Sequence, residues 1–348
     1  MNSLSAPEQA LASGHWVKLI CGASNQDLVA IEDLSGLYSL AGVHCIDAAV
    51  DGAVVEAVRR GMAWAAERGA GRPWLMLSLS DGVDPHFRKA WFDPQACPSS
   101  CPRPCERVCP ALAIGAAATG SAGVLAARCY GCGRCVPACP LGLIEERSQV
   151  LAAEAVPALL AELRPDAVEL HSQPGRLAAF ASRVSQLAAS GVPLRRVAVS
   201  MGPEGSATRV DALATELWQR FVVLREAGYR PLWQLDGRPM SGDLGVGVTH
   251  AALHLLEGLQ PLAPPGPLQL AGGTNAHTLA GLQRCGLAHR GSGAGAAGVA
   301  FGGEARRRLQ PWLHAAQQRG SRLLDLDDLW TEALESARAL VGPWLKDR

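Results

Sequence analysis

The sequence lacks several features that would assign the protein to a broad class at once. Its 32 basic residues balance 32 acidic ones, and its longest basic run is Arg306-Arg307-Arg308, so nucleic-acid binding has no electrostatic footprint. No apolar stretch approaches the roughly 20 residues that span a bilayer. Residues 1–14 have neither the basic nor the apolar segment of a secretion signal. We therefore expect a cytoplasmic protein that neither binds nucleic acid nor spans a membrane.

Cysteine, in contrast, is abundant. The chain contains 11 cysteines among 348 residues, and without a secretion signal these indicate metal binding rather than disulfides. With 48% hydrophobic residues, the chain can also bury a large core. Eight of the cysteines fall in two short runs.

The more informative run has the spacing Cys-x2-Cys-x2-Cys-x3-Cys-Pro, which is typical of bacterial ferredoxins. Its four cysteines are Cys129, Cys132, Cys135 and Cys139. Gly131 and Gly133 remove side chains where the loop must fold closely around a cluster. A structural zinc site is the alternative, but such sites usually have two separated Cys-x2-Cys pairs. The run therefore predicts a 4Fe-4S cluster.

A second run lies upstream and is also followed by proline. Its four cysteines are Cys97, Cys101, Cys105 and Cys109. The segments Cys109-Pro-Ala-Leu-Ala-Ile114 and Cys139-Pro-Leu-Gly-Leu-Ile144 are parallel, which indicates a degenerate internal repeat. In two-cluster ferredoxins each run lends its last cysteine to the other cluster. The repeat therefore predicts one cluster on Cys97, Cys101, Cys105 and Cys139, and another on Cys129, Cys132, Cys135 and Cys109.

The upstream run departs from the ferredoxin pattern because all its steps are x3. A 3Fe-4S cluster, or one cysteine that binds no iron, are both open for this run. The spacing also fails the Cys-x3-Cys-x2-Cys pattern of radical S-adenosylmethionine enzymes, because Arg103 and Pro104 supply no thiolate.

Outside the cysteine region, strand-like runs alternate with helix-like segments. The expected strands are residues 17–21, 43–49, 74–79, 166–170, 195–200, 231–235, 268–270 and 298–301. Eight β/α units predict a (β/α)8 TIM-barrel-like domain, with a doubly wound open sheet as the rival. A ferredoxin-like insertion at 92–146 follows the third strand, so the barrel is formed by 1–91 and 147–348. The insertion should then lie over the carboxyl ends of the strands, where barrels hold their active sites.

Polar residues follow several predicted strands and form a candidate site at the barrel mouth. They are Ser24, Asn25, Asp47, Asp51, Asp81, Glu169, His171, Asp236 and Arg238. The polar loop at 235–243 is long for its place, which favours a functional role for Asp236 and Arg238. Ordinary turn and helix-capping chemistry is the alternative for all of them.

Two glycine-rich turns follow the seventh and eighth strands, where phosphate groups bind in many barrels. Their residues are Gly272, Gly273, Thr274 and Asn275 in the first turn, and Gly302 and Gly303 in the second. Flavin mononucleotide or another phosphate ligand is the cofactor that they favour. The alternative is that glycine only permits the strand-to-helix turn.

For the remaining cysteines, Cys21, Cys45 and Cys285, we expect burial as small hydrophobes.

With both cysteine runs and the barrel in place, the chain resembles the cyanobacterial LdpA family of light-dependent period modulators. The segments that carry the resemblance start at Lys18, Ala41, Cys101, Cys129, Asp236 and Leu270, and they extend over nearly the whole chain. The resemblance implies an iron–sulfur protein that reports cellular redox state to the circadian clock and adjusts its period with light. It also implies association with clock proteins.

Two functions follow. The first is a redox sensor, in which photosynthetic electron flow sets the state of the clusters. The second is an iron–sulfur oxidoreductase, flavin-dependent or not, with an active site at the barrel mouth and an electron donor or a quinone as partner. The resemblance favours the sensor over the enzyme.

Overall fold

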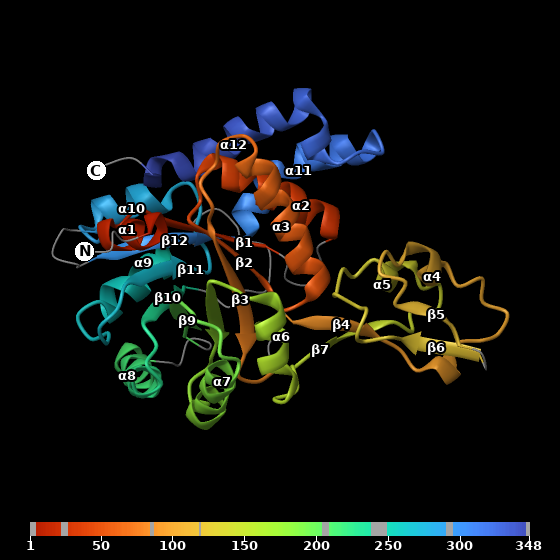
Figure 1. Ribbon diagram of the computed structural model, residues 1–348, viewed down its shortest axis with the longest axis horizontal. Helices are drawn as coiled ribbons and strands as arrows, with labels where there is room; N and C mark the ends of the chain where they lie inside the picture. The colour runs from red at the N-terminus through yellow and green to blue at the C-terminus, as the bar shows by residue number, and fades with distance from the viewer. Residues whose placement is uncertain are drawn as a thin grey trace.

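A parallel β-barrel forms the body of the protein (Figure 1). The computed structural model describes residues 5–21, 27–83, 87–117, 120–203, 209–237, 249–289 and 295–345. Within these residues, eight strands close in the order β1-β12-β11-β10-β9-β8-β3-β2. The barrel strands are β1 (Trp16–Ile20), β2 (Cys45–Ala49), β3 (Trp74–Ser80), β8 (Ala167–His171), β9 (Arg196–Met201), β10 (Pro231–Asp236), β11 (Leu268–Ala271) and β12 (Ala296–Phe301). The predicted (β/α)8 barrel is confirmed.

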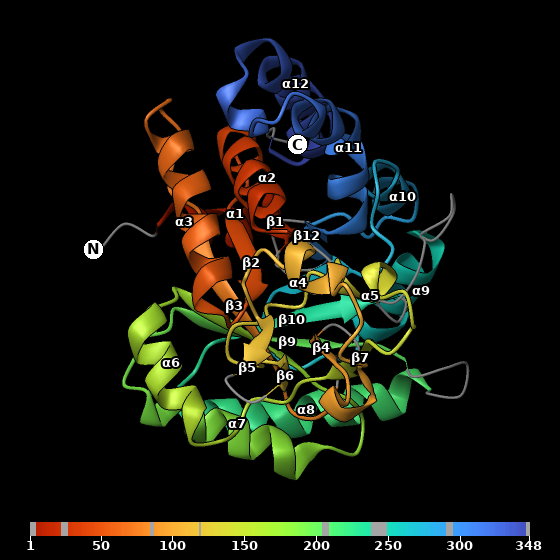
Figure 2. The same cartoon turned by 90° about the vertical axis from the view of Figure 1, so that its right-hand side faces the viewer.

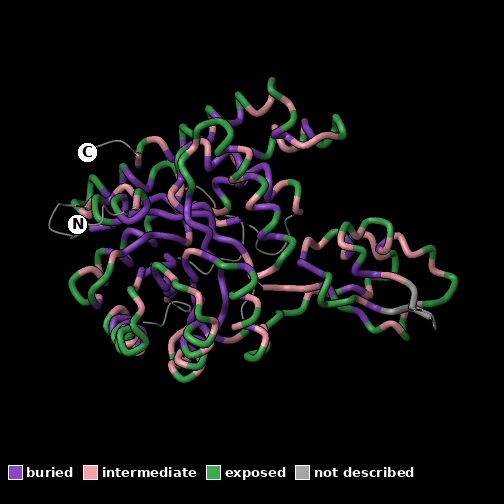
Figure 3. Tube along the Cα trace, in the orientation of Figure 1, coloured by how far each residue is buried: buried purple, intermediate pink, exposed green. Residues whose placement is uncertain are grey.

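Helices follow the strands and surround the barrel. They are α2 (Leu28–Ala41), α3 (Gly52–Ala66), α6 (Ala155–Leu163), α7 (Leu177–Ala189), α8 (Val210–Glu226), α9 (Thr249–Leu259), α10 (Thr278–Arg284), α11 (Gly303–Gln318) and α12 (Asp327–Leu345). The strands are buried on both faces, between the barrel interior and these helices (Figure 3). This double burial explains why the strands appear in the sequence as nearly continuous apolar runs.

Capping residues fix where the helices begin. Asp27 precedes α2, and its carboxylate accepts hydrogen bonds from the backbone N–H groups of Val29 and Ala30. Asp51 does the same for the first turn of α3. Each carboxylate satisfies N–H groups that have no partner within the helix.

A helix that no sequence pattern indicated, α1 (Ala6–Ser13), closes the amino-terminal end of the barrel. Leu11 packs with Trp16 and Trp74, whose rings meet edge to face at 5.4 Å. The Glu8 carboxylate accepts two hydrogen bonds from Arg196, at 2.9 and 2.8 Å. The helix has only 8 residues, which are too few for a helical spacing of apolar side chains to stand out in the sequence.

The cysteine region leaves the barrel after β3 and returns before α6. Strands β4 (Arg88–Trp91) and β7 (Glu145–Ser148) pair antiparallel and form its stalk. Beyond them lie α4 (Pro104–Val108), β5 (Ile114–Ala117), β6 (Gly120–Val124) and α5 (Cys135–Ala138), with the 3-10 turn η1 (Pro94–Ala96). Figure 2 shows this insert in front of the barrel, over the end where the strands terminate. No helix of the described residues has the length and apolar character to cross a membrane.

The insert has its own small core, which is separate from that of the barrel. The core contains Ala90, Phe92, Cys105, Ala113, Ile114, Cys129, Cys135 and Ile144. Because most buried side chains of the insert belong to this separate core, we expect the barrel to fold without the insert. Tyr130 is an exception, since it packs into the barrel core.

Replacing residues 92–144 by Asn-Gly tests this expectation. Trp91 and Glu145 face each other at the end of the β4–β7 ladder, so a two-residue turn can join them. The shortened chain should unfold in one cooperative transition, as followed by circular dichroism during denaturation. A broad, non-cooperative transition would show that the insert is part of the barrel core.

Candidate functional site

The two halves of the insert repeat one backbone arrangement at a spacing of 30 residues. Cys109 and Cys139 each end a short helix, α4 or α5. The Cys109 Sγ accepts a hydrogen bond from the N–H of Ala113 at 3.3 Å, and the Cys139 Sγ accepts one from Leu143 at 3.4 Å. The internal repeat that the sequence suggested is therefore present in the structure.

Backbone conformation shows why the first half is hard to recognise in the sequence. Gly133 and Gly142 have positive φ angles of 75° and 62°. Their counterparts, Arg103 and Leu112, adopt φ angles of 47° and 49° although they carry side chains. Left-handed conformations favour glycine. The first half keeps the shape of the second without its glycines.

Thiols from both runs gather in each half of the insert. One cavity is lined by the four thiols Cys109, Cys129, Cys132 and Cys135, together with Tyr130 and apolar side chains. In the other half, burial and then the nearby Cys139 and Cys97 raise the pKa of Cys105. The last cysteine of each run thus lies among the first cysteines of the other. Which thiols bind iron stays a prediction.

The surroundings of these thiols suit an iron–sulfur cluster. Burial and then the neighbouring Cys132 raise the pKa of the Tyr130 hydroxyl, which lies within hydrogen-bonding reach of that thiol. A thiolate at Cys132 would accept this hydrogen bond. At Cys139, burial alone would raise the pKa, but backbone N–H groups of residues 141–144 lower it. No three Cys, His, Asp or Glu side chains of the described chain converge as they would around a single metal ion.

The cysteine loop of the second run contacts the barrel at two points. The Arg134 Nη2 atom lies 2.5 Å from Asp27 Oδ2, on the carboxylate that caps α2. The Tyr130 ring is buried in the main hydrophobic core. The loop that holds three thiols is therefore fixed to the amino terminus of a barrel helix.

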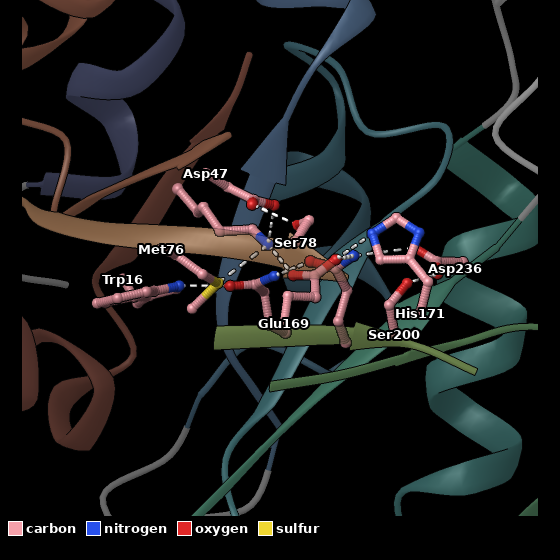
Figure 4. A network of polar contacts seen from close by, with 11 residues as sticks. Trp16, Asp47, Met76, Ser78, Glu169, His171, Ser200 and Asp236 are labelled. Carbon is pink, nitrogen blue, oxygen red and sulfur yellow. Dashed lines mark hydrogen bonds and ion pairs between the residues drawn. The ribbon is translucent and has the colours of Figure 1, made fainter. Parts of the chain in front are cut away.

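Inside the barrel, a buried lysine lies between two carboxylates, Asp47 and Glu169. Figure 4 shows these two carboxylates within the polar network. The Lys18 ammonium from β1 contacts Asp47 Oδ2 of β2 at 2.9 Å and also Glu169 of β8. Burial would lower the lysine pKa, but both carboxylates raise it, so the ammonium stays charged. Burial favours the neutral acid at Glu169, yet Lys18 and His171 lower its pKa to about 2. The interior thus contains an ion-pair cluster where most barrels contain branched apolar side chains.

Amide side chains extend this cluster across the barrel. The Gln234 Nε2 atom donates to Glu169 at 2.8 Å, and Gln269 Nε2 donates to Gln234 at 2.5 Å. The Trp16 indole N–H donates to Gln269 in turn. The chain of hydrogen bonds therefore runs from the closed end of the barrel to its charged centre.

Toward the mouth, the network continues to residues that the sequence pattern had marked. The His171 Nε2 atom lies 3.1 Å from Glu169 Oε1. Asp236 accepts a hydrogen bond from Ser200. Burial is the main reason that the pKa of Asp236 is raised to about 6. His171 also meets the ring of Phe87 at 5.3 Å, so the network reaches the segment that leads into the insert.

The predicted mouth residues therefore divide into three groups. Asp47, Glu169, His171 and Asp236 belong to one connected network (Figure 4). Asp51 caps α3, and Asp81 accepts a hydrogen bond from Ser172, so these two serve local structure. The other three predicted residues, Ser24, Asn25 and Arg238, lie outside the described residues.

Lys18, Gln234 and Gln269 also belong to this network, although they were not predicted from the sequence. All three are polar residues in the middle of otherwise apolar strands, and all are fully buried. The signal that could have revealed the network is Lys18, which lies between the apolar residues Val17 and Leu19 of a strand. Because an unpaired buried charge is costly, such a lysine needs carboxylates nearby.

The glycine-rich turns have internal roles in this structure. Thr274 is buried and donates to the carbonyl of Ala300, while Asn275 Oδ1 accepts from the N–H of His277. Gly302 precedes α11, and a Cβ at that position would meet Ile20 at an ordinary 3.5 Å.

Of the isolated cysteines, Cys21 and Cys45 are buried as expected. The expectation for Cys285 is wrong, because it ends α10 on the solvent side and is exposed.

The fold and the insert together define a (β/α)8 barrel protein with an iron–sulfur insertion. Residues 97–150 match the model of the LdpA Fe–S cluster-binding domain, and residues 159–343 match that of the light dependent period A C-terminal domain. Light dependent period A of Synechococcus elongatus is 46% identical over 344 residues, which are 98% of this chain and 94% of that protein. The chain belongs to the LdpA family.

Among solved structures, the YdjI aldolase from Escherichia coli K12 aligns with 96% of this chain and 92% of its own. The TM-score is 0.42 and the sequence identity is 10%. A similarity of that size identifies no shared activity.

The Asp236 carboxyl predicts a specific pH dependence of stability. Its pKa is raised to about 6, so the folded state binds the proton more tightly than the unfolded state. The stabilisation is complete below the unfolded pKa, near 4, and is lost as the pH rises through about 6. Relative to Asp236→Asn, the free energy of unfolding of the natural protein should fall by up to about 3 kcal/mol across this interval. Urea unfolding at several pH values measures this difference, and a constant difference would contradict the assignment.

Proposed function

We propose that the protein is a redox sensor with two iron–sulfur clusters of the 4Fe-4S type. The first would be held by Cys97, Cys101, Cys105 and Cys139, and the second by Cys129, Cys132, Cys135 and Cys109. A 3Fe-4S cluster in the first position is the alternative, because of the wider spacing of its run. When bound, such clusters supply one-electron oxidation and reduction.

The observation that supports this proposal is that the last cysteine of each run lies near thiols of the other run. Cys109 lies in the cavity of the downstream run, and Cys139 lies beside Cys97 and Cys105 of the upstream run. Two-cluster ferredoxins exchange ligands in this way. The equal backbone geometry of Cys109 and Cys139 supports the same role for both.

The contacts of the cysteine loop suggest how the barrel would respond. Added negative charge beside the loop attracts the Arg134 guanidinium and so competes with its ion pair to Asp27. Asp27 in turn caps α2. A change in the loop would therefore reach the first turn of a barrel helix, and a partner that contacts this helix would detect it.

The proposed partner comes from the relative. The name of that protein, light dependent period A, connects it with the control of period by light. We propose that this chain also passes redox state to the circadian clock and modulates its period, through association with clock proteins in the cytoplasm. An electron donor or a quinone would set the state of the clusters.

An iron–sulfur oxidoreductase is the second candidate, and the charged network inside the barrel is the observation that favours it. Clusters of ionisable groups with shifted pKa values occur often in active sites. Protein purified without oxygen separates the two candidates. Bound flavin together with turnover of generic electron donors and acceptors would favour the enzyme, whereas iron–sulfur absorbance without turnover favours the sensor.

Paired cysteine substitutions test the ligand assignment. Cys132→Ser should remove one cluster, about half of the iron. Adding Cys109→Ser should cost little more iron, since both residues would serve the same cluster. Adding Cys139→Ser to Cys132→Ser should remove nearly all of it. Equal iron in the two double variants, measured by anaerobic iron and sulfide analysis, would contradict the exchange of ligands.

A phosphate site at the glycine-rich turns is a further part of the proposal. Gly302 precedes α11 and Gly303 begins it, and the first turn of a helix has N–H groups without a partner inside the helix, which favour an anion. Gly272, Gly273, Thr274, Asn275, Asp236 and Arg238 would complete a site for flavin mononucleotide or inorganic phosphate.

Gly302→Ala tests this site with little disturbance, because its Cβ would make only ordinary contact with Ile20. The substitution should weaken binding of either ligand about tenfold in titration calorimetry. Iron content should stay unchanged. If the natural protein binds neither ligand, the glycines serve only the turns.

A further inference from the structure

A cavity lies between the barrel and the insert, and its walls come from both. It has a volume of about 60 Å³ and is open on one side. The ends of β2 and β3 form one wall, the stalk strand β4 a second, and the cysteine loop a third. The lining residues are Ala49, Val50, Asp51, Ser78, Leu79, Ser80, Phe87, Arg88, Lys89, Tyr130, Gln149, Leu151 and Arg183.

Arg183 of α7 is a buried cation in the lining of this cavity. It is 6% exposed, yet its hydrogen-bond partners are all neutral. Its guanidinium donates to the carbonyls of Ser80 and Leu151, at 2.9 and 2.8 Å, and to the amide oxygen of Gln186 at 2.7 Å. Within the described residues, no carboxylate lies within ion-pair distance of it. Because the guanidinium has five N–H groups, it can still donate to a ligand.

Nearby carboxylates are engaged elsewhere. The charge of Asp81 acts on Arg183 only at longer range. The Asp81 Oδ1 atom lies 3.5 Å from Arg176 Nη1, and its Oδ2 atom accepts a hydrogen bond from Ser172. Asp51, the one carboxylate in the lining, caps α3. A buried charge without an opposite charge beside it is unfavourable. An anion in the cavity would remove this cost.

The rest of the lining restricts the kind of anion. Lys89 adds positive charge on the stalk side, where Arg88 is paired with Glu146 at 3.7 Å, whereas Leu79, Phe87 and Leu151 make much of the wall apolar. Tyr130 adds an aromatic ring, and aromatic side chains favour flat ligands. The single guanidinium of Arg183 can bind one carboxylate group through two N–H groups, which favours a ligand with one carboxylate.

We propose that this cavity binds a small aromatic carboxylate, with the carboxylate on Arg183 and the ring against the apolar wall. The site also connects with the proposed cluster, because Tyr130 lines both this cavity and the cavity of Cys109, Cys129, Cys132 and Cys135. A bound anion disfavours added negative charge nearby, so the ligand should lower the reduction potential of that cluster. Reduction should weaken ligand binding by the same factor. This second part depends on the proposed function.

Titration calorimetry with benzoate and benzamide tests the site on the complete protein. The two probes have the same ring and differ in charge, so benzoate should bind at least about tenfold more tightly. Arg183→Gln should remove this preference, while Arg176→Gln, the same change outside the cavity, should keep it. Since Arg183 also holds backbone carbonyls, Ala49→Leu serves as a second variant that fills the cavity and leaves the guanidinium intact. It should abolish benzoate binding.

Equal affinity for the two probes, undetectable benzoate binding, or unchanged binding in Ala49→Leu would overturn the site. A potentiometric titration then tests the coupling: benzoate should lower the cluster potential in the natural protein and not in Ala49→Leu. Binding without a shift in potential would overturn the coupling. Protein that binds benzoate but contains no cluster would contradict the proposed function and leave the anion site in place.

Discussion

The charge of Lys18 constrains the whole interior of the barrel. A buried ammonium is tolerated only when carboxylates and further hydrogen-bond partners surround it. Asp47 and Glu169 supply the charge from two other strands, and Gln234 satisfies the remaining oxygen of Glu169. These contacts join β1, β2, β8 and β10 through side chains as well as through the barrel walls. For these contacts to form, the strand register must place Lys18, Asp47, Glu169 and Gln234 at one level of the barrel. The network therefore favours one register of the closed barrel over others.

The insert depends on the barrel for its position and has its own core for its shape. Its stalk continues from the strand end that also supplies Ser78, a partner of Asp47 at 2.5 Å. Its cysteine loop meets the barrel through Tyr130 and Arg134. Between these contacts lies the cavity with Arg183. The seam between the two units therefore brings together the candidate cluster, the cap of α2 and the charged interior.

Much of this arrangement could be predicted from the sequence, because it rests on local patterns. Apolar runs and helix stops predicted the barrel, and cysteine spacing predicted the insert. The network was only partly predictable. Asp47, Glu169 and His171 fall toward or just past the carboxyl ends of the predicted strands, where polar residues attract notice, but Lys18 falls near the beginning of one. In the structure Lys18, Asp47 and Glu169 are each the middle residue of a strand. Arg183 carried no sequence signal, since an arginine on an amphipathic helix is usually exposed. Its contacts with the carbonyls of Ser80 and Leu151, 103 and 32 residues away in the chain, come from the tertiary fold, which no local pattern reveals.

Hydrogen exchange of oxidised and reduced protein shows whether the state of the insert reaches the barrel. We predict altered protection in the cysteine loop at 129–135 and in the first turn of α2, which Asp27 connects. Helix α8, on the far side of the barrel from α5 in Figure 1, should exchange equally in both states. Identical exchange in α2, in protein whose iron content shows that its clusters are present, would contradict a connection between the clusters and the barrel.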